Sequence, residues 1–259
     1  MKQSILHTEE LSIGYSSKKG GHLIKENIQI SLEAGKLITL LGANGIGKST
    51  LLKTLTGIIP PLSGSVKLAN KEISSYEPQE LAQELSVVLT EKLPPSNLNI
   101  AELIALGRQP YTNWLGTLTE TDFEYIEKAI TLTDIHHLID KKHDEISDGQ
   151  LQKVLIARAL AQDTPLIILD EPTTHLDLYH KVAVFKLLQK LAHEAKKCIL
   201  FSTHDLDLAI QLSDEVIVMT ETFCVQDQPC NLIEKNVFDL LFKDEHIVFD
   251  KQYGKFMVK

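Results

Sequence analysis

One segment constrains the fold of this chain more than any other. The sequence Gly42-Ala43-Asn44-Gly45-Ile46-Gly47-Lys48-Ser49 follows the apolar run Leu37–Leu41. A short apolar run is typical of a buried strand, and the residues from about Lys48 to Thr56 predict a helix that Gly57 ends. The pattern G-x-x-x-x-G-K-[ST] between a strand and a helix is typical of a loop that binds phosphate groups. The sequence therefore predicts an α/β protein with a phosphate site at the end of one strand.

The chemistry of this loop follows from its residue types. Glycine lets the backbone curl, so that several N–H groups face one anion, and the start of the helix adds unpaired N–H groups and a partial positive charge. We expect Lys48 to reach the β- and γ-phosphates and the Ser49 hydroxyl to bind Mg²⁺. The predicted nucleotide-binding residues of this segment are Gly42, Ala43, Asn44, Gly45, Ile46, Gly47, Lys48, Ser49 and Thr50.

Polar residues follow two further apolar runs. Asp170 and Glu171 come directly after Leu166–Leu169, and His204 follows the run that begins at Cys198. In an open α/β sheet, ligands bind beyond the carboxyl ends of the strands. Asp170 suits a Mg²⁺ contact, whereas Glu171 suits the orientation or deprotonation of an attacking water. We expect the imidazole of His204 to hydrogen-bond the γ-phosphate.

Strand-like and helix-like segments alternate along the 259 residues. Residues around 4–15 and 22–33 read as strands, as do Leu166–Leu169, Cys198–Phe201 and Glu215–Met219. The expected fold is a phosphate-loop core with a mainly parallel sheet, an N-terminal antiparallel portion and an inserted helical subdomain at about 91–160. Residues 1–225 would form the domain that contains the phosphate loop, and 226–259 a C-terminal extension with a helix and a weak strand pair.

The segment Ser147-Asp148-Gly149-Gln150 opens a helix that runs through Ala161, with Ser147 and Gln150 as a capping box. The order of motifs resembles that of the ATP-binding-cassette ATPases over roughly residues 4–220. Their signature pattern is Leu-Ser-Gly-Gly-Gln, where this chain has Ile146-Ser147-Asp148-Gly149-Gln150. His175-Leu176-Asp177 matches the dimer-contact loop of the family, His204 its switch histidine and Tyr15 the aromatic residue that stacks on adenine.

The resemblance implies a mechanism. Two cassettes pair head to tail, and each ATP lies between the phosphate loop of one chain and the signature helix of the other. The implied catalytic residues are Lys48, Glu171 and His204, and the implied cofactors are ATP and Mg²⁺. Ser147, Gly149 and Gln150 would contact ATP from across a homodimer, or a heterodimer with a similar chain.

Two residues depart from the family pattern. Glu91 stands where the family usually has a glutamine that touches Mg²⁺ and the attacking water, and we expect it to tune metal affinity or resting turnover. Asp148 replaces a glycine close to ATP. An acidic residue in the first turn favours the helix but opposes an incoming phosphate, so we expect its side chain to point outward, toward basic groups.

The stretch from Ile100 to Tyr111 resembles a segment of cassettes that power importers for iron-siderophore, haem and cobalamin. The resemblance implies an integral membrane permease, whose coupling helix enters a groove near Glu91, and a substrate-binding protein that delivers the cargo. The alternatives are the ATPase subunit of another importer or of an exporter, and a cassette that acts on nucleic acid or ribosomes without transport.

Composition narrows these alternatives. A net charge of −9 without a Lys/Arg-rich run disfavours nucleic-acid binding, which needs clustered basic residues. No apolar run reaches the ~18–20 residues of a membrane span, and the first residues lack a secretory h-region. Cys198, Cys224 and Cys230 are wrongly spaced for a zinc site. We expect a peripheral protein at the cytoplasmic face of the plasma membrane that binds no nucleic acid.

Overall fold

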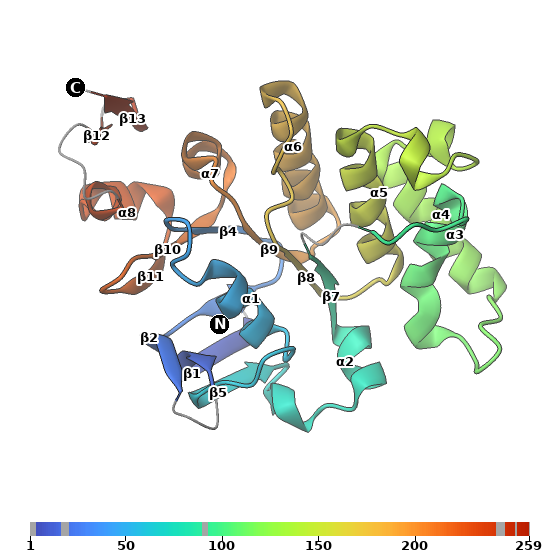
Figure 1. The fold of residues 1–259 in the computed structure, drawn as a ribbon, viewed down its shortest axis with the longest axis horizontal. Helices are drawn as coiled ribbons and strands as arrows, with labels where there is room; N and C mark the ends of the chain where they lie inside the picture. Colours follow the sequence, from blue (N-terminus) through green and yellow to red (C-terminus); the bar gives the residue numbers. More distant parts are fainter. Residues whose placement is uncertain (1–3, 17–20, 90–92, 242–246, 252, 259) are drawn as a thin grey trace.

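The computed structural model describes residues 4–16, 21–89, 93–241, 247–251 and 253–258. These residues form two sheets, a C-terminal hairpin and the surrounding helices (Figure 1). The strands are β1 (Ser4–Tyr15), β2 (His22–Ile28), β3 (Ser31–Glu33), β4 (Leu37–Leu41), β5 (Ser63–Leu68), β6 (Lys71–Glu72), β7 (Leu85–Val88), β8 (Leu166–Leu169), β9 (Cys198–Ser202), β10 (Glu215–Met219), β11 (Cys224–Asp227), β12 (Ile247–Asp250) and β13 (Lys255–Val258). The α-helices are α1 (Lys48–Leu55), α2 (Pro78–Glu84), α3 (Ile100–Ala105), α4 (Glu120–Thr133), α5 (Asp148–Ala161), α6 (Leu178–Glu194), α7 (Leu206–Leu212) and α8 (Pro229–Glu234).

The larger sheet has the strand order β11-β10-β4-β9-β8-β7, and only β11 runs antiparallel to its neighbour. Its central strands are apolar because both faces are buried. In β4, for example, Leu37 and Leu41 pack toward one hydrophobic cluster and Ile38 and Leu40 toward the other. Helices α6 and α7 lie on one side of this sheet, with α1 and the N-terminal sheet on the other (Figure 1). The predicted α/β core and its buried strands are therefore confirmed.

The N-terminal sheet is antiparallel, as expected, with the order β2-β1-β5-β6 and β3 paired to β1. Residues 22–33 form two strands, where the sequence predicts one. The reason is the Thr8 hydroxyl, which donates to the carbonyl of Ile28 at 2.9 Å and accepts from the N–H of Ile30 at 2.8 Å. This side chain adds to the backbone hydrogen bond from the N–H of Thr8 to the carbonyl of Ile30, at 2.9 Å, at the break between β2 and β3.

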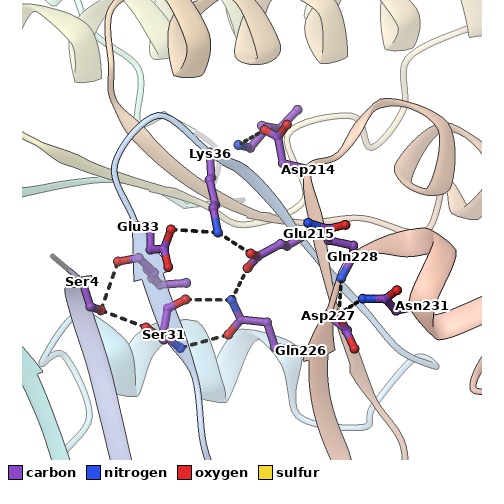
Figure 2. Close-up of polar contacts among 12 residues, drawn as sticks. Ser4, Ser31, Glu33, Lys36, Asp214, Glu215, Gln226, Asp227, Gln228 and Asn231 are labelled. Atoms are coloured by element: carbon purple, nitrogen blue, oxygen red, sulfur yellow. Dashed lines mark hydrogen bonds and ion pairs between the residues drawn. The ribbon is translucent and has the colours of Figure 1, made fainter. Parts of the chain in front are cut away.

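A polar network joins the two sheets (Figure 2). Lys36, just before β4, pairs with Glu33 of β3 at 2.9 Å and with Glu215 of β10. The amide of Gln226 in β11 donates to Glu215 and to the carbonyl of Ser31, and its oxygen accepts from the N–H of Ser31 at 2.9 Å. These contacts fix the N-terminal sheet relative to the strand that precedes the phosphate loop.

Helices α3, α4 and α5 lie between β7 and β8 in the sequence and form the inserted helical part at one end of the molecule (Figure 1). The capping boxes predicted at Asn99 and Thr119 are both present. Glu91, the predicted metal ligand at the start of the insert, lies outside the described residues. The division of the chain at residues 225/226 falls within β11, so it stays an interpretation of the sequence.

The C-terminal residues contain α8 and the β12–β13 hairpin, as the sequence predicts. The ring of Phe249 lies 5.1 Å from that of Phe238 and 5.0 Å from that of Phe256, and Phe238 is fully buried. This aromatic cluster attaches the hairpin to the main core. None of the helices in the described part of the chain combines the length and apolar character that a membrane span requires.

Arg108 organises the inserted part. It is 4% exposed, pairs with Asp122 of α4 at 2.8 Å and donates to the carbonyl of Ala161 at the end of α5. The guanidinium lies over the rings of Tyr111 and Tyr125, at 4.0 and 4.4 Å from their centroids. The family-like stretch that contains Arg108 thus has a structural reason, because this side chain ties α4 and α5 to the segment after α3.

We expect Arg108→Met to destabilise the protein by about 3 kcal/mol, because the buried carboxylate of Asp122 loses its cationic partner and keeps only its hydrogen bonds from Thr119. Denaturant unfolding of the purified chain measures the change. Lys71→Met is the matched control, since Lys71 and Glu80 form an exposed pair at 2.9 Å and its loss should change stability little. Equal stability of the two variants would contradict this role of Arg108.

Candidate functional site

The phosphate loop connects β4 to α1. Gly47 caps α1 with φ of 108°, and a Cβ atom at this position would lie 2.4 Å from Cγ2 of Ile24, so a glycine is required. The side chain of Lys48 is buried, and its amine donates to the carbonyls of Gly42 at 2.9 Å and Ala43 at 3.3 Å. No side chain caps the first turn of α1, so its N–H groups are available to an anion in the predicted position.

The two carboxylates at the end of β8 are held by β9. The Ser202 hydroxyl donates to Oδ1 of Asp170 at 2.6 Å and accepts from the N–H of Glu171 at 2.9 Å. Glu171 has φ of 49°, a conformation that turns the chain sharply after the strand. Its Oε1 lies 2.7 Å from Nε2 of His204, and its Oε2 accepts from the Thr174 hydroxyl at 3.0 Å.

These contacts set the charge of Glu171. Burial alone would raise the pKa of its carboxyl, but hydrogen bonds from His204 and Thr174 and the attraction of His204 and Lys48 outweigh it. The pKa of Glu171 therefore lies below the ordinary 4.5, and the group is ionised at neutral pH. Burial lowers the pKa of Lys48, and the nearby carboxylates of Glu171 and Asp170 partly oppose that shift. The structure thus brings Lys48, Asp170, Glu171 and His204 into one electrostatic cluster.

Tyr15 joins the same site from β1. Its hydroxyl lies 3.1 Å from the Thr50 hydroxyl of α1, and 49% of the residue is exposed. A half-exposed ring beside the helix that follows the phosphate loop has the apolar face that a base can stack on. The predicted stacking of adenine on Tyr15 is compatible with this position and stays a prediction.

The signature residues Ser147, Gly149 and Gln150 lie at the start of α5, away from the phosphate loop (Figure 1). Ser147 caps α5, and the predicted capping box with Gln150 is present. Helix α5 belongs to the inserted part, apart from α1 (Figure 1), so a single chain does not bring Ser147, Gly149 and Gln150 to its own phosphate loop. Asp148 is exposed and forms no ion pair within the described residues. The expected approach of Asp148 to basic groups of its own chain is therefore not seen in them.

The donor set fits Mg²⁺ only together with a phosphate. Ser49 is exposed in the first turn of α1 and Asp170 ends β8, and both offer the oxygen ligands that Mg²⁺ prefers. Within the described residues, no group of three or more His, Cys, Asp and Glu side chains is arranged to hold a metal ion by protein ligands alone. Mg²⁺ in nucleotide sites is commonly held by one or two protein ligands and by phosphate oxygens, which is what Ser49 and Asp170 would supply.

A groove of about 960 Å³ lies beside the inserted part. Its walls come from α2, the segment after α3 and α5, and they include Val87, Leu106, Pro110, Trp114 and Arg158. Trp114 is 91% exposed and Leu106 47% exposed. The groove is therefore open and partly apolar, and it lies in the region that the sequence predicts to receive a permease segment.

The sequence did not single out Ser202 or Thr174, which hold the two carboxylates. A hydroxyl that ends an otherwise apolar strand is a weak signal, because Ser202 acquires its partners only when β8 and β9 pair. Thr174 contacts Glu171 only through the turn that follows β8.

Comparison with known proteins places these features in a family. The family model described as ABC transporter matches residues 25–174, which is more than half of the chain. An uncharacterized ABC transporter ATP-binding protein of Methanocaldococcus jannaschii is 37% identical over 98% of this chain and 87% of its own. The achromobactin transport ATP-binding protein of Dickeya dadantii is also 37% identical, over 90% and 87%. The iron(3+)-hydroxamate import ATP-binding protein of Bacillus subtilis is 35% identical, over 96% and 92%.

Solved structures agree with this grouping. A transporter described as metal-chelate type, in an inward-facing conformation, contains a chain with a TM-score of 0.80 and 26% identity, covering 98% of this chain and 96% of that one. A nucleotide-free ATP-binding cassette from an ABC transporter matches with a TM-score of 0.77 and 26% identity, over 92% and 96%.

We expect His204→Ala to raise the pKa of the Glu171 carboxyl, because the hydrogen bond and charge of His204 are lost while the burial remains. Carbon-13 NMR of the nucleotide-free protein follows this titration, with Glu171→Gln to assign the signal. The wild-type pKa should lie below 4.5 and that of the variant above the wild-type value. His193→Ala removes a histidine that pairs with Asp214 and should leave Glu171 unchanged. An unchanged titration in His204→Ala would contradict the assigned cause.

Proposed function

The chain belongs to the ABC transporter family, as one of its ATP-hydrolysing subunits, and from this premise we propose that it powers an importer for cargo of the iron-siderophore, haem or cobalamin type. Two relatives with nearly full coverage are named for the transport of achromobactin and the import of iron(3+)-hydroxamate. The stretch from Ile100 to Tyr111 supports the same class. The ATPase chemistry rests on one observation, the gathering of Glu171 and His204 beside the phosphate-loop residue Lys48.

The first part of the mechanism is nucleotide binding. The N–H groups of the loop and of the first turn of α1 receive the phosphates, while Lys48 exchanges its carbonyl partners for the β- and γ-phosphates. Ser49 and Asp170 would hold Mg²⁺, and this ion would supply positive charge to neutralise the phosphate oxygens. The ring of Tyr15 stacks on the base.

The second part is the release of Glu171. Both of its carboxylate oxygens are engaged without nucleotide, one by His204 and the other by Thr174. A γ-phosphate competes for the imidazole of His204, because the phosphate carries more negative charge than the carboxylate. Glu171 then has a free oxygen with which to orient the attacking water. The resting contact thus keeps both oxygens of Glu171 engaged until ATP is in place.

The third part is assembly. The start of α5 carries the partial positive charge of a helix N-terminus, with the N–H of Gln150 capped by Ser147. It lies apart from the phosphate loop of its own chain (Figure 1). A second copy completes each site when Ser147, Gly149 and Gln150 of the partner subunit contact ATP.

The dimer sits at the cytoplasmic face of the plasma membrane. The groove around Trp114 receives a helix of the permease, and a substrate-binding protein supplies the cargo.

The function is tested by capture and transport. Gentle solubilisation of native membranes, capture of this protein and mass spectrometry should recover a polytopic permease. In a strain without the endogenous chain, wild type should restore uptake of ⁵⁵Fe-siderophore. Glu171→Gln should reduce that uptake by about 100-fold or more, because the loss of a general base has effects of this size.

The control for charge is Glu234→Gln on the exposed side of α8, which should transport like wild type. Recovery of ribosomal proteins without a permease would refute the transport function. Capture of a permease without siderophore uptake would reassign the chain to another importer or to an exporter.

We expect Trp114→Ala to reduce capture of the permease by about tenfold or more, because an exposed tryptophan at a groove is a common anchor in interfaces. The affinity for ATP should not change, since Trp114 lies in the insert. Phe123→Ala is the matched control, because Phe123 is 58% exposed on α4 and does not line the groove. The same loss of permease in both variants would argue against the groove as the docking surface.

A further inference from the structure

Two consecutive residues in the first turn of α6 contact two different parts of the ATPase machinery. His180 lies against the start of α5, where Ser147, Gly149 and Gln150 are. Lys181 lies against the loop that carries His204. The proposed mechanism uses neither residue. Helix α6 itself is a firm support, because Val184, Phe185 and Leu188 of its next turns are buried in the core.

The contact of His180 with α5 is close. A Cβ atom on Gly149 would lie 2.8 Å from Cδ2 and 3.2 Å from Cγ of the His180 ring, so the ring covers the Cα atom of this glycine. The ring is itself fixed. Its Nδ1 lies 2.8 Å from Oδ1 of Asp177, and the same oxygen accepts from the backbone N–H of His180 at 2.9 Å. The dimer-contact loop, which ends at Asp177, and the signature helix are therefore joined through one imidazole.

Lys181 contacts the loop that follows β9, whereas His180 contacts α5. Its amine donates to Oδ1 of Asp205 at 2.6 Å, and Asp205 directly follows His204. Oδ2 of Asp205 accepts from the hydroxyls of Thr173 at 2.8 Å and Thr203 at 3.2 Å, and both threonines are buried. Lys181 thus ties α6 to the loops on either side of Glu171 and His204.

We infer that the first turn of α6 is a positioning element that links the two ATP sites, with His180 setting the signature helix and Lys181 setting the His204 loop. The inference rests on the proposed head-to-tail sandwich. In that sandwich the signature helix serves the ATP of the partner, whereas His204 serves the ATP of its own chain. The first turn of α6 contacts both elements, so it is placed to couple the two sites.

Substitutions of the two residues should therefore change different kinetic parameters. His180→Ala should raise the KM for ATP by about tenfold and weaken ATP-driven dimerisation of the Glu171→Gln protein, with kcat little changed. Lys181→Met should lower kcat by about tenfold with little change in KM, because the His204 loop is loosened while the signature helix stays in place. A change of about tenfold in the apparent affinity for ATP lies within the usual range of coupling between binding sites. In either variant the Hill coefficient for ATP should fall.

The experiment uses the full chain. ATPase assays give kcat, KM and the Hill coefficient, and a fluorescent ATP analogue gives the nucleotide affinity. Light scattering follows dimerisation, and thermal unfolding gives the midpoint temperature. Lys181→Arg should restore kcat, and His180→Gln should restore part of the affinity, since a planar amide can cover Gly149 and donate to Asp177. Lys186→Met, an exposed lysine on the same helix, should behave as wild type.

A purely structural role would change KM and kcat together, in step with the thermal midpoint, and would overturn the inference. Wild-type dimerisation by His180→Ala, or wild-type kcat in Lys181→Met, would also overturn it while leaving the proposed function intact. Absence of ATP-driven dimerisation in the parent Glu171→Gln protein would refute the sandwich itself, and the inference with it.

Discussion

The burial of parallel strands on both faces of one sheet is the constraint on which the rest of this structure depends. Because β4, β8 and β9 run in the same direction side by side, their carboxyl ends meet at one edge. The phosphate loop, the carboxylate pair and His204 leave the sheet at this edge. Apolar side chains alternate between two hydrophobic clusters along each strand, so a shift of one residue in register would move every side chain to the wrong face. Core packing therefore also fixes the geometry of the site.

Polar contacts refine this arrangement where the strands end. One hydroxyl, that of Ser202, positions both Asp170 and the backbone of Glu171, and the side chain of Glu171 is in turn paired with His204. Beyond the strands, α6 continues the network to α5 and to the His204 loop. The sheet edge and the insert are therefore mechanically connected within one chain, although the residues that would bind a given ATP come from two chains.

In the inserted part, a residue of the family-like stretch has a structural role. Arg108 belongs to the stretch that resembles importer cassettes, and its side chain is buried against Asp122 and two tyrosines. Its effect on a partner is indirect, because it shapes the segment from Leu106 to Tyr111 that forms one wall of the groove. Trp114, which also lines the groove, carried no signal in the sequence, since an isolated tryptophan has no periodic or motif context.

The sequence by itself determined the features that depend on neighbours in the chain. These are the apolar strands, the glycine-rich loop, the helix caps at Asn99, Thr119 and Ser147, and the order of motifs that identifies the family. Only the tertiary structure decided the contacts between distant residues, such as Ser202 with Asp170, 32 residues apart, and Lys181 with Asp205, 24 apart. It also decided the β5–β6 hairpin, whose turn places Ala69 and Asn70 at φ of 48° and 64° without the usual glycine. Local patterns specify which element forms, whereas a hydrogen bond between two elements exists only after packing brings them together.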